Sequence, residues 1–337
     1  MKNKQEHDGR RAPGGKLAGF LPLVLLVIVL GLAACSAGDE PADASEFATP
    51  LSNQVALHED DHSEADHTHL DADEITTQLN VVMVPSEIVV GPNRFAVGLF
   101  DAQGQLIHDA QVHFHYYDLR DPDTATLDQE ADAQRVQDPE GFTTIFTHDR
   151  DFEEPGLWGV EVEVRLPDGN AARQRLGFEI QEDTATLGPG EKVPLLNTLV
   201  LDDVDQNPAR LTSALEPLLE LHRMSLAQAL SNNKPTLLLL ATPAYCQTRI
   251  CGPSYEMVSQ LYPRYADRLN FVYSEVFNTL PDPAVDGWRP SPVMTAFGLE
   301  SEPWVIFIDA DGTIVYRLEG MFTAEEIERQ LQERFGF

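Results

Sequence analysis

The chain has 337 residues, of which 55 are acidic and 23 are basic, so its formal net charge is −32. Acidity of this size argues against nucleic acid as a partner, because phosphate binding needs clustered Lys and Arg side chains. The length leaves room for two ordinary domains with additional segments. Solvation of the chain is the simplest role for the charge.

Residues 1–34 predict a targeting segment that is not part of the fold. A basic stretch precedes an uncharged apolar run from Leu17 to Leu32, and small residues stand directly before Cys35. This pattern resembles a bacterial lipoprotein signal peptide, in which cleavage precedes the cysteine and the cysteine is lipidated. An uncleaved transmembrane anchor is the alternative, since the apolar run nearly reaches spanning length. Either way, the rest of the chain is expected on the extracytoplasmic face of the cell membrane.

Residues 35–74 predict a disordered acidic linker, because Ala, Asp, Glu, Ser, Thr and His predominate and little of the stretch could form a core. Four histidines stand among its carboxylates: His58, His62, His67 and His69. Imidazole and carboxylate together suit zinc or copper, so the stretch is a candidate for loose metal capture. A flexible tether that is merely rich in histidine is the alternative.

Residues 75–182 predict an antiparallel β-sandwich that is immunoglobulin-like in architecture. Short β-prone runs are separated by turn signals, and no strong helical period occurs. The runs are 79–84, 95–100, 110–117, 142–147, 159–166 and 175–180. The strings GPNRFAVGLFDAQGQLIHDAQVHFHYYDL and PGLWGVEVEV are similar to small exported sandwich domains of the YtkA or FixH kind. For some of those domains the resemblance implies an association with copper handling.

His113 and His115 stand two residues apart in a predicted strand, so both rings are expected on one face of it. Two imidazoles on one face can form half of a metal site, with His108 or His148 as the completion. A pair of half-exposed strand histidines without a metal is the plainer interpretation. Trp158 is predicted to be a core side chain.

A connector at 183–210 leads to a predicted α/β domain at 211–337. The four-leucine run Leu237–Leu240 is too short for an ordinary helix and predicts a strand buried on both faces. The remaining pattern predicts a short helix starting at Ser225, a strand at 269–276, a hairpin across the Asp-Gly step, and a final helix capped by Thr323 and Glu326.

Two cysteines follow the buried strand. If Cys35 carries a lipid, Cys246 and Cys251 are left as a pair, which can form a disulfide in an oxidising compartment. Pro253 suits the first turn of a helix, and a helix N-terminus favours a thiolate over a thiol. The pair therefore predicts redox chemistry. The alternative is a disulfide that only stabilises the turn, although cross-linking so short a loop contributes little stability.

The strand ending in ATPAYC, the dithiol, the helix after it and the segment AFGLESEPWVIFIDADGTIV resemble the thioredoxin-like superfamily. The arrangement is most similar to that of exported members of the TlpA and Sco types, and the similarity covers roughly residues 225–337. Pro303 stands where that family carries a cis-proline facing the dithiol. Four residues, in place of the usual two, separate Cys246 from Cys251. The register of the strand favours Cys246 as the attacking sulfur, and the local Cys-Gly-Pro match favours Cys251.

The resemblance implies thiol–disulfide exchange with extracytoplasmic thiol or disulfide proteins, and no required cofactor. Arg249 is placed to stabilise a thiolate, or is a solvated loop residue. No acidic residue interrupts the buried strand, so the buried carboxylate that some thioredoxins use is missing there. Glu275 and Glu302 are the candidates to replace it.

Two other functions compete with this one. The first is a copper-binding lipoprotein, a metallochaperone that assists the assembly of a respiratory complex. The Sco type adds a histidine from downstream of the dithiol, whereas His222 is the last histidine here and lies upstream. The second is a non-catalytic binding module, because one fold supports many functions.

Overall fold

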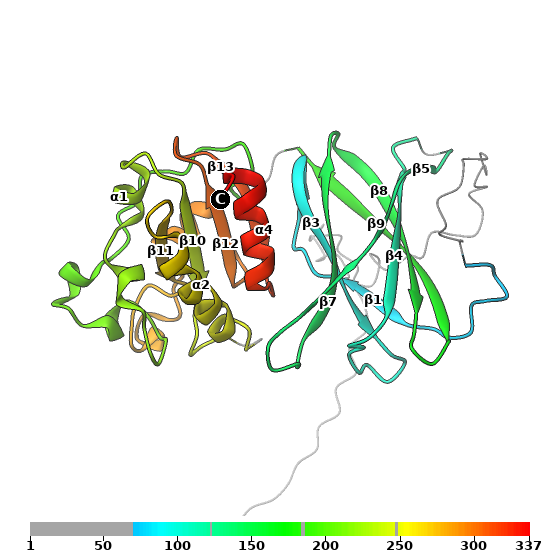
Figure 1. The fold of residues 1–337 in the computed structure, drawn as a ribbon, viewed down its shortest axis with the longest axis horizontal. Helices are drawn as coiled ribbons and strands as arrows, with labels where there is room; N and C mark the ends of the chain where they lie inside the picture. Colours follow the sequence, from blue (N-terminus) through cyan, green and yellow to red (C-terminus); the bar gives the residue numbers. More distant parts are fainter. Residues whose placement is uncertain (1–69, 122, 183–185, 247–248) are drawn as a thin grey trace, which may run out of the picture. The chain divides into compact units, whose positions relative to one another are not determined.

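The computed structural model describes residues 70–121, 123–182, 186–246 and 249–337 (Figure 1). Its first nine strands are β1 (Asn80–Met83), β2 (Ile88–Val89), β3 (Gly91–Phe100), β4 (Gln111–Asp118), β5 (Thr126–Asp132), β6 (Gln134–Gln137), β7 (Thr144–Phe152), β8 (Gly156–Arg165) and β9 (Ala171–Gln181). They form a four-stranded sheet, β1-β3-β7-β6, and a five-stranded sheet, β2-β9-β8-β4-β5. The short β2 pairs with β9 in parallel, a departure from the antiparallel pairing expected throughout.

A single hydrophobic core joins the inner faces of these two sheets. Phe95 of β3 lies with its ring centroid 5.3 Å from the rings of both Phe114 and Tyr116 of β4, in edge-to-face geometry. Trp158 of β8 is buried in the same core, as predicted. The predicted β-sandwich is confirmed, because each of the six expected runs overlaps a strand.

Three strands are missing from the prediction, namely β2, β5 and β6. The sequence of β5 is TLDQEAD, and almost all of its side chains are exposed. β5 ends the five-stranded sheet and β6 ends the four-stranded one, so neither needs an apolar face. Hydrophobic alternation, the signal used for the other strands, is therefore absent from β5.

The second half of the described chain forms a mixed four-stranded sheet in the order β11-β10-β12-β13. Its strands are β10 (Thr236–Ala241), β11 (Asn270–Glu275), β12 (Trp304–Ile308) and β13 (Ile314–Glu319). β10 pairs with β11 in parallel and with β12 in antiparallel fashion. The predicted buried strand is confirmed as β10, an inner strand whose four leucines are fully buried.

Helices cover both faces of this sheet. The helices are α1 (Leu226–Leu230), α2 (Cys251–Tyr265), α3 (Pro292–Phe297) and α4 (Ala324–Phe335). α2 and α4 lie on the same face, where Leu237 and Leu239 meet them, and Figure 1 shows both helices in front of the sheet. α1 and α3 pack with Leu238 and Leu240 on the opposite face. Because successive leucines of β10 point to opposite faces of the sheet, helices pack on both faces and the sheet becomes the middle of three layers.

Parts of two segments that were predicted to be linkers pack against the folded chain. Leu70 belongs to the predicted disordered linker, yet it is buried. In the predicted connector, the Gly190 N–H donates to Ile314 O at 2.8 Å and the Val193 N–H donates to Gly312 O at 3.0 Å. This part of the connector therefore lies along β13. The connector also contains 3-10 turns at Leu201–Val204 and Pro208–Arg210.

Candidate functional site

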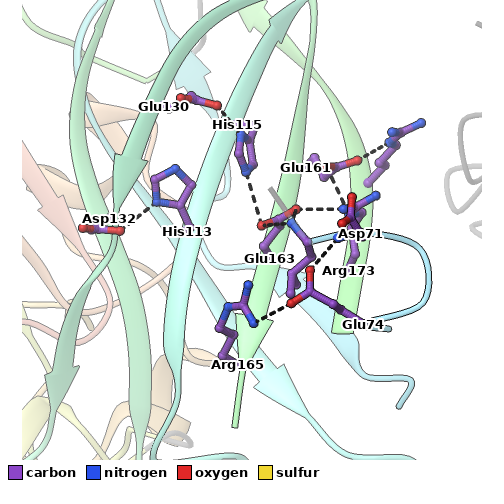
Figure 2. Close-up of polar contacts among 12 residues, drawn as sticks. Asp71, Glu74, His113, His115, Glu130, Asp132, Glu161, Glu163, Arg165 and Arg173 are labelled. Carbon is purple, nitrogen blue, oxygen red and sulfur yellow. Dashed lines mark hydrogen bonds and ion pairs between the residues drawn. The ribbon is translucent and has the colours of Figure 1, made fainter. Parts of the chain in front are cut away.

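Two histidines of β4 lie between carboxylates on both neighbouring strands. Their rings point to the outer face of the five-stranded sheet, because the residues between and beside them enter the core. The pairing register places each histidine opposite one acidic residue on β5 and another on β8. The resulting rows across the sheet are Asp132–His113–Glu163 and Glu130–His115–Glu161 (Figure 2). The predicted common face of the two histidines is confirmed.

The polar atoms in these rows are close together. His113 Nδ1 lies 2.7 Å from Asp132 Oδ1, and His115 Nδ1 lies 2.7 Å from Glu130 Oε1. His115 Nε2 lies 3.6 Å from Glu163 Oε2, and the two imidazole centroids are 4.7 Å apart. One ligand atom each from His113, His115 and Glu130 all lie within 4.8 Å of one another. This spacing is somewhat wider than the separation of ligand atoms around a small cation.

Exposure increases across the cluster toward β5. The side chains of His115 and His113 are 2% and 16% exposed, whereas those of Glu130 and Asp132 are 40% and 68% exposed. The imidazoles are therefore shielded while the carboxylates of β5 face solvent. A cation from solution can reach the cluster from the β5 side.

The carboxylates of β8, on the side of the histidines away from β5, form ion pairs with arginines of β9. Arg173 Nη2 lies 3.0 Å from Glu163 Oε1, and Arg175 Nε lies 2.5 Å from Glu161 Oε2. The Leu70 N–H donates to Glu163 Oε1 at 3.0 Å. A second group of potential ligand atoms, from His115, Glu161 and Glu163, is therefore already held by arginines and by the backbone.

The histidines expected to complete a metal site lie elsewhere. His108 Nδ1 is 2.9 Å from Thr144 Oγ1, and His148 Nδ1 is 3.3 Å from the Tyr116 hydroxyl. Among the residues that the structure describes, no three-ligand group includes either of them. The expected completion is wrong, because carboxylates of the overlooked strand β5 take that place. Acidic residues at alternate positions of residues 128–132 are the sequence signal for it.

The two cysteines lie where β10 ends and α2 begins. The Cys246 N–H donates to Thr242 O at 3.0 Å, which turns the chain directly after the strand. The Sγ atoms of Cys246 and Cys251 and a carboxylate oxygen of Glu302 lie within 4.8 Å of one another. The Glu302–Pro303 peptide is cis and immediately precedes β12, the neighbour of β10. The expected cis-proline is therefore found at Pro303.

The two sulfurs differ in burial. Cys251 is 0% exposed, and Cys246 is partly exposed. The two side chains are hydrogen-bonded to each other, and the expected disulfide between them stays a prediction. A hydrogen bond with Cys246, followed by burial, raises the pKa of the Cys251 thiol far above its ordinary value. At Cys251 these two effects oppose the thiolate that a helix N-terminus is expected to favour.

Two carboxyl groups lie near the dithiol. Burial, followed by the charges of Cys246 and Glu275, raises the pKa of Glu302. Burial also raises the pKa of Glu275, whose Oε2 is 2.8 Å from both the Tyr273 hydroxyl and the Ser213 N–H. Of the two predicted substitutes for a buried carboxylate, Glu302 is the one within reach of both sulfurs. A raised pKa suits a group that exchanges protons near neutral pH.

Arg249 is exposed and has a left-handed φ of 63°. Its predicted role at the dithiol stays a prediction.

Cys35 and the four linker histidines, His58, His62, His67 and His69, lie outside the described residues. Within the described residues, no helix combines the length and apolar character that a membrane crossing requires.

Comparison with known proteins gives weak structural likenesses. No protein-family model and no curated protein sequence matches the chain. CopC from Methylosinus trichosporium OB3b is similar at 15% identity and a TM-score of 0.22, over 31% of this chain and 97% of CopC. The PmoD soluble domain from Methylocystis sp. ATCC 49242 (Rockwell) is similar at 14% identity and a TM-score of 0.22, over 31% of this chain and 91% of PmoD.

A third likeness is to the CARDB domain of a Pyrococcus furiosus protein, which was solved in complex with di-metal ions. It has 12% identity and a TM-score of 0.19, and covers 34% of this chain and 100% of that domain. Similarity at this level assigns no activity to this chain.

Proposed function

We propose that this protein is a thioredoxin-like thiol–disulfide oxidoreductase that acts on the extracytoplasmic face of the cell membrane, where a lipid on Cys35 holds it. One observation carries the proposal. The sulfurs of Cys246 and Cys251 and the Glu302 carboxylate lie within 4.8 Å at the end of a buried inner strand. The three-layered α/β arrangement around β10 supports the same class.

The difference in burial supports a division of labour between the sulfurs. Cys246 is partly exposed, so a partner disulfide can reach its sulfur. The Cys246 thiolate attacks one sulfur of that disulfide, which forms a mixed disulfide and releases the partner's other sulfur as a thiolate. This assigns the attacking role to Cys246, one of the two alternatives that the sequence left open.

Cys251 then resolves the mixed disulfide. Its thiol loses a proton, and its sulfur attacks Cys246 Sγ, which releases the second partner thiolate and leaves a Cys246–Cys251 disulfide. Glu302 is placed to accept the Cys251 proton, since its carboxylate lies within 4.8 Å of both sulfurs. The partner gains two electrons and the dithiol loses two. The reverse sequence oxidises a partner, and the relative reduction potentials set the direction.

The partners of this reaction are extracytoplasmic proteins that carry accessible thiols or disulfides, and the reaction requires no cofactor. The test traps them as mixed disulfides. In a Cys251→Ser variant the resolving sulfur is missing, so Cys246 is expected to retain its partners in adducts that a reductant releases. Non-reducing electrophoresis followed by mass spectrometry identifies the adducts.

Cys246→Ser is the matched control for this trap, because it keeps the buried cysteine of the pair and removes the partly exposed one. It is expected to give no adducts, and the double Cys→Ser variant is expected to reduce insulin no faster than the buffer does. Equal trapping through either cysteine would contradict the assigned roles. An absence of turnover in the wild-type protein would contradict the enzyme and leave a non-catalytic module.

Copper binding is the second candidate function, and the same group of atoms favours it. Cysteine sulfurs are soft ligands that select Cu(I), and the Glu302 carboxylate supplies a third donor within 4.8 Å. Titration with Cu(I) against a chromophoric chelator tests this function. Tight binding that both Cys→Ser variants lose, without thiol–disulfide turnover, would replace the oxidoreductase by a copper metallochaperone.

A further inference from the structure

The outer face of the five-stranded sheet carries a charge pattern that packing does not require. Across β5, β4, β8 and β9, the register gives the rows Asp132–His113–Glu163–Arg173 and Glu130–His115–Glu161–Arg175. On the β9 side each glutamate faces an arginine, so negative and positive charges balance there. On the β5 side each carboxylate faces an imidazole, which is neutral when it carries a single ring proton.

We propose that His113, His115 and Glu130 bind a single divalent transition-metal ion, Zn²⁺ or Cu²⁺, on this face. One ligand atom from each of the three already lies within 4.8 Å of the others. Two imidazoles with a carboxylate form a donor set that suits both ions. The site is independent of the dithiol, since it uses other residues on another sheet.

The contacts of the two imidazoles with neighbouring carboxylates give each ring nitrogen a role (Figure 2). Asp132 holds His113 through Nδ1 at 2.7 Å, which directs Nε2 to the ion. His115 Nε2 lies 3.6 Å from Glu163 Oε2, a charge contact too long for a hydrogen bond, and Nδ1 is the ring nitrogen beside Glu130, so we assign Nδ1 to the ion. Metal-binding histidines commonly use one ring nitrogen for the metal and the other for a carboxylate that orients the ring.

Binding requires one exchange and one small movement. His115 Nδ1 and Glu130 Oε1, 2.7 Å apart, share a proton that the ion would displace into solvent. Donor atoms around a tetrahedral zinc ion, each about 2.1 Å from it, lie about 3.4 Å from one another. The three ligand atoms, which now lie within 4.8 Å of one another, must therefore move closer together. Glu130 can make this movement because its side chain is 40% exposed.

The arginines decide which of the two groups on this face takes the ion. Glu161 and Glu163 are bound by Arg173 and Arg175, so a cation beside them would meet two guanidinium groups. Glu130 instead contacts His115, and within the described part of the chain no Lys or Arg forms an ion pair with it. The ion is therefore assigned to the β5 side.

The experiment uses the full-length mature chain with the other metal-binding residues removed. In this background Cys246 and Cys251 are changed to Ser and the linker histidines to Gln: His58, His62, His67 and His69. Isothermal titration with Zn²⁺ alone or Cu²⁺ alone is expected to show a single ion bound. His115→Gln and Glu130→Gln are each expected to abolish that binding or weaken it severely.

Two further variants separate ligands from neighbours. Asp132→Asn, which alters only the orienting carboxylate, is expected to weaken binding roughly 10- to 100-fold. His108→Gln is the matched control, because this histidine lies on the same sandwich but outside the cluster, and it is expected to change nothing. With Cu²⁺, electron paramagnetic resonance is expected to show coupling to two imidazole nitrogens, and to one in His113→Gln.

Glu130→Gln keeps the test valid if His115→Gln fails to fold, because Glu130 is on the exposed strand at the end of the sheet. Circular dichroism of each variant reports whether it is folded. Binding that survives in the His113→Gln/Glu130→Gln double variant would overturn the site, as would a background protein that binds neither ion. In that case the two rows would serve only to hold the sheet together.

Discussion

Burial separates two sulfurs that look equivalent in the sequence. Cys246 and Cys251 both follow the buried strand, and sequence patterns favoured each of them as the attacking sulfur for a different reason. The structure leaves Cys246 partly exposed and buries Cys251 completely. Reagents from solution can therefore reach Cys246 more readily than Cys251.

A buried histidine makes stability depend on pH. His222 is buried, its Nε2 lies 3.1 Å from the Tyr255 hydroxyl, and burial lowers its pKa to about 4. The ordinary histidine pKa is about 6.5, so between these values the unfolded chain binds more protons than the folded one. Stability gained from His222 is therefore complete above about pH 6.5 and is lost as the pH falls toward about 4.

The expected slope is at most about 1.4 kcal/mol of unfolding free energy per pH unit inside this window. Urea unfolding of the wild type and of His222→Gln at several pH values measures it. The variant is expected to lose less stability on acidification than the wild type. Parallel pH profiles would show that His222 is protonated without cost in the folded protein.

At the scale of elements, the first turn of α4 allows a test of the capping pair that the sequence predicts. The Thr323 hydroxyl accepts a hydrogen bond from the Glu326 N–H at 3.2 Å, and the Glu326 carboxylate accepts one from the Thr323 N–H at 3.0 Å. Thr323→Ala is expected to lower the unfolding free energy by about 1 kcal/mol, because it leaves a backbone N–H unpaired. Chemical denaturation measures the loss. Thr323→Ser, which keeps the hydroxyl, is the control, and equal losses in both variants would argue against capping.

The elements that the sequence predicted are those with an apolar pattern or a local signature. β10 was predicted from its leucine run, and α4 from the capping pair Thr323 and Glu326. β5 escaped prediction because a strand at the edge of a sheet has no need to alternate. Glu130 was missed with it, so the histidine pair was found without its partner. Side-chain patterns along a chain do not reveal cross-strand register, which decides what faces His115.

At the dithiol, sequence could place the residues but not their environments. Cys246, Cys251 and Pro303 were expected together from a resemblance, and Glu302 was one of two acidic candidates. Only the fold distinguishes Glu302, within reach of both sulfurs, from Glu275, which bonds Tyr273. A hydrogen bond with Cys246, followed by burial, also raises the pKa of Cys251 against the expected direction, and both effects depend on three-dimensional packing.

At the scale of the whole molecule, the proposed lipid anchor sets the compartment in which the dithiol works. Metabolic labelling with an alkyne-tagged fatty acid is expected to mark the wild type and Cys246→Ser, and to leave Cys35→Ala unmarked. The reason is that Cys35 is the proposed acylation site. Mass spectrometry of the N-terminal peptide supplies the complementary measurement. An unlabelled wild-type protein that retains residues 1–34 would instead indicate an uncleaved anchor.

The position of β5 at the end of its sheet bears on how separate copies of the molecule meet. A terminal strand offers unpaired backbone N–H and C=O groups to any strand that approaches, which is the usual route to edge-to-edge aggregation. Glu130 and Asp132 stand two positions apart on β5 and both project from its outer face, where they contact His115 and His113. Asp128 lies at the register shift of the β4–β5 pairing and instead forms an ion pair with Arg150. Like charges of this kind repel a second copy. The residues that would attract a cation are thus also placed to oppose the joining of neighbouring chains into fibres.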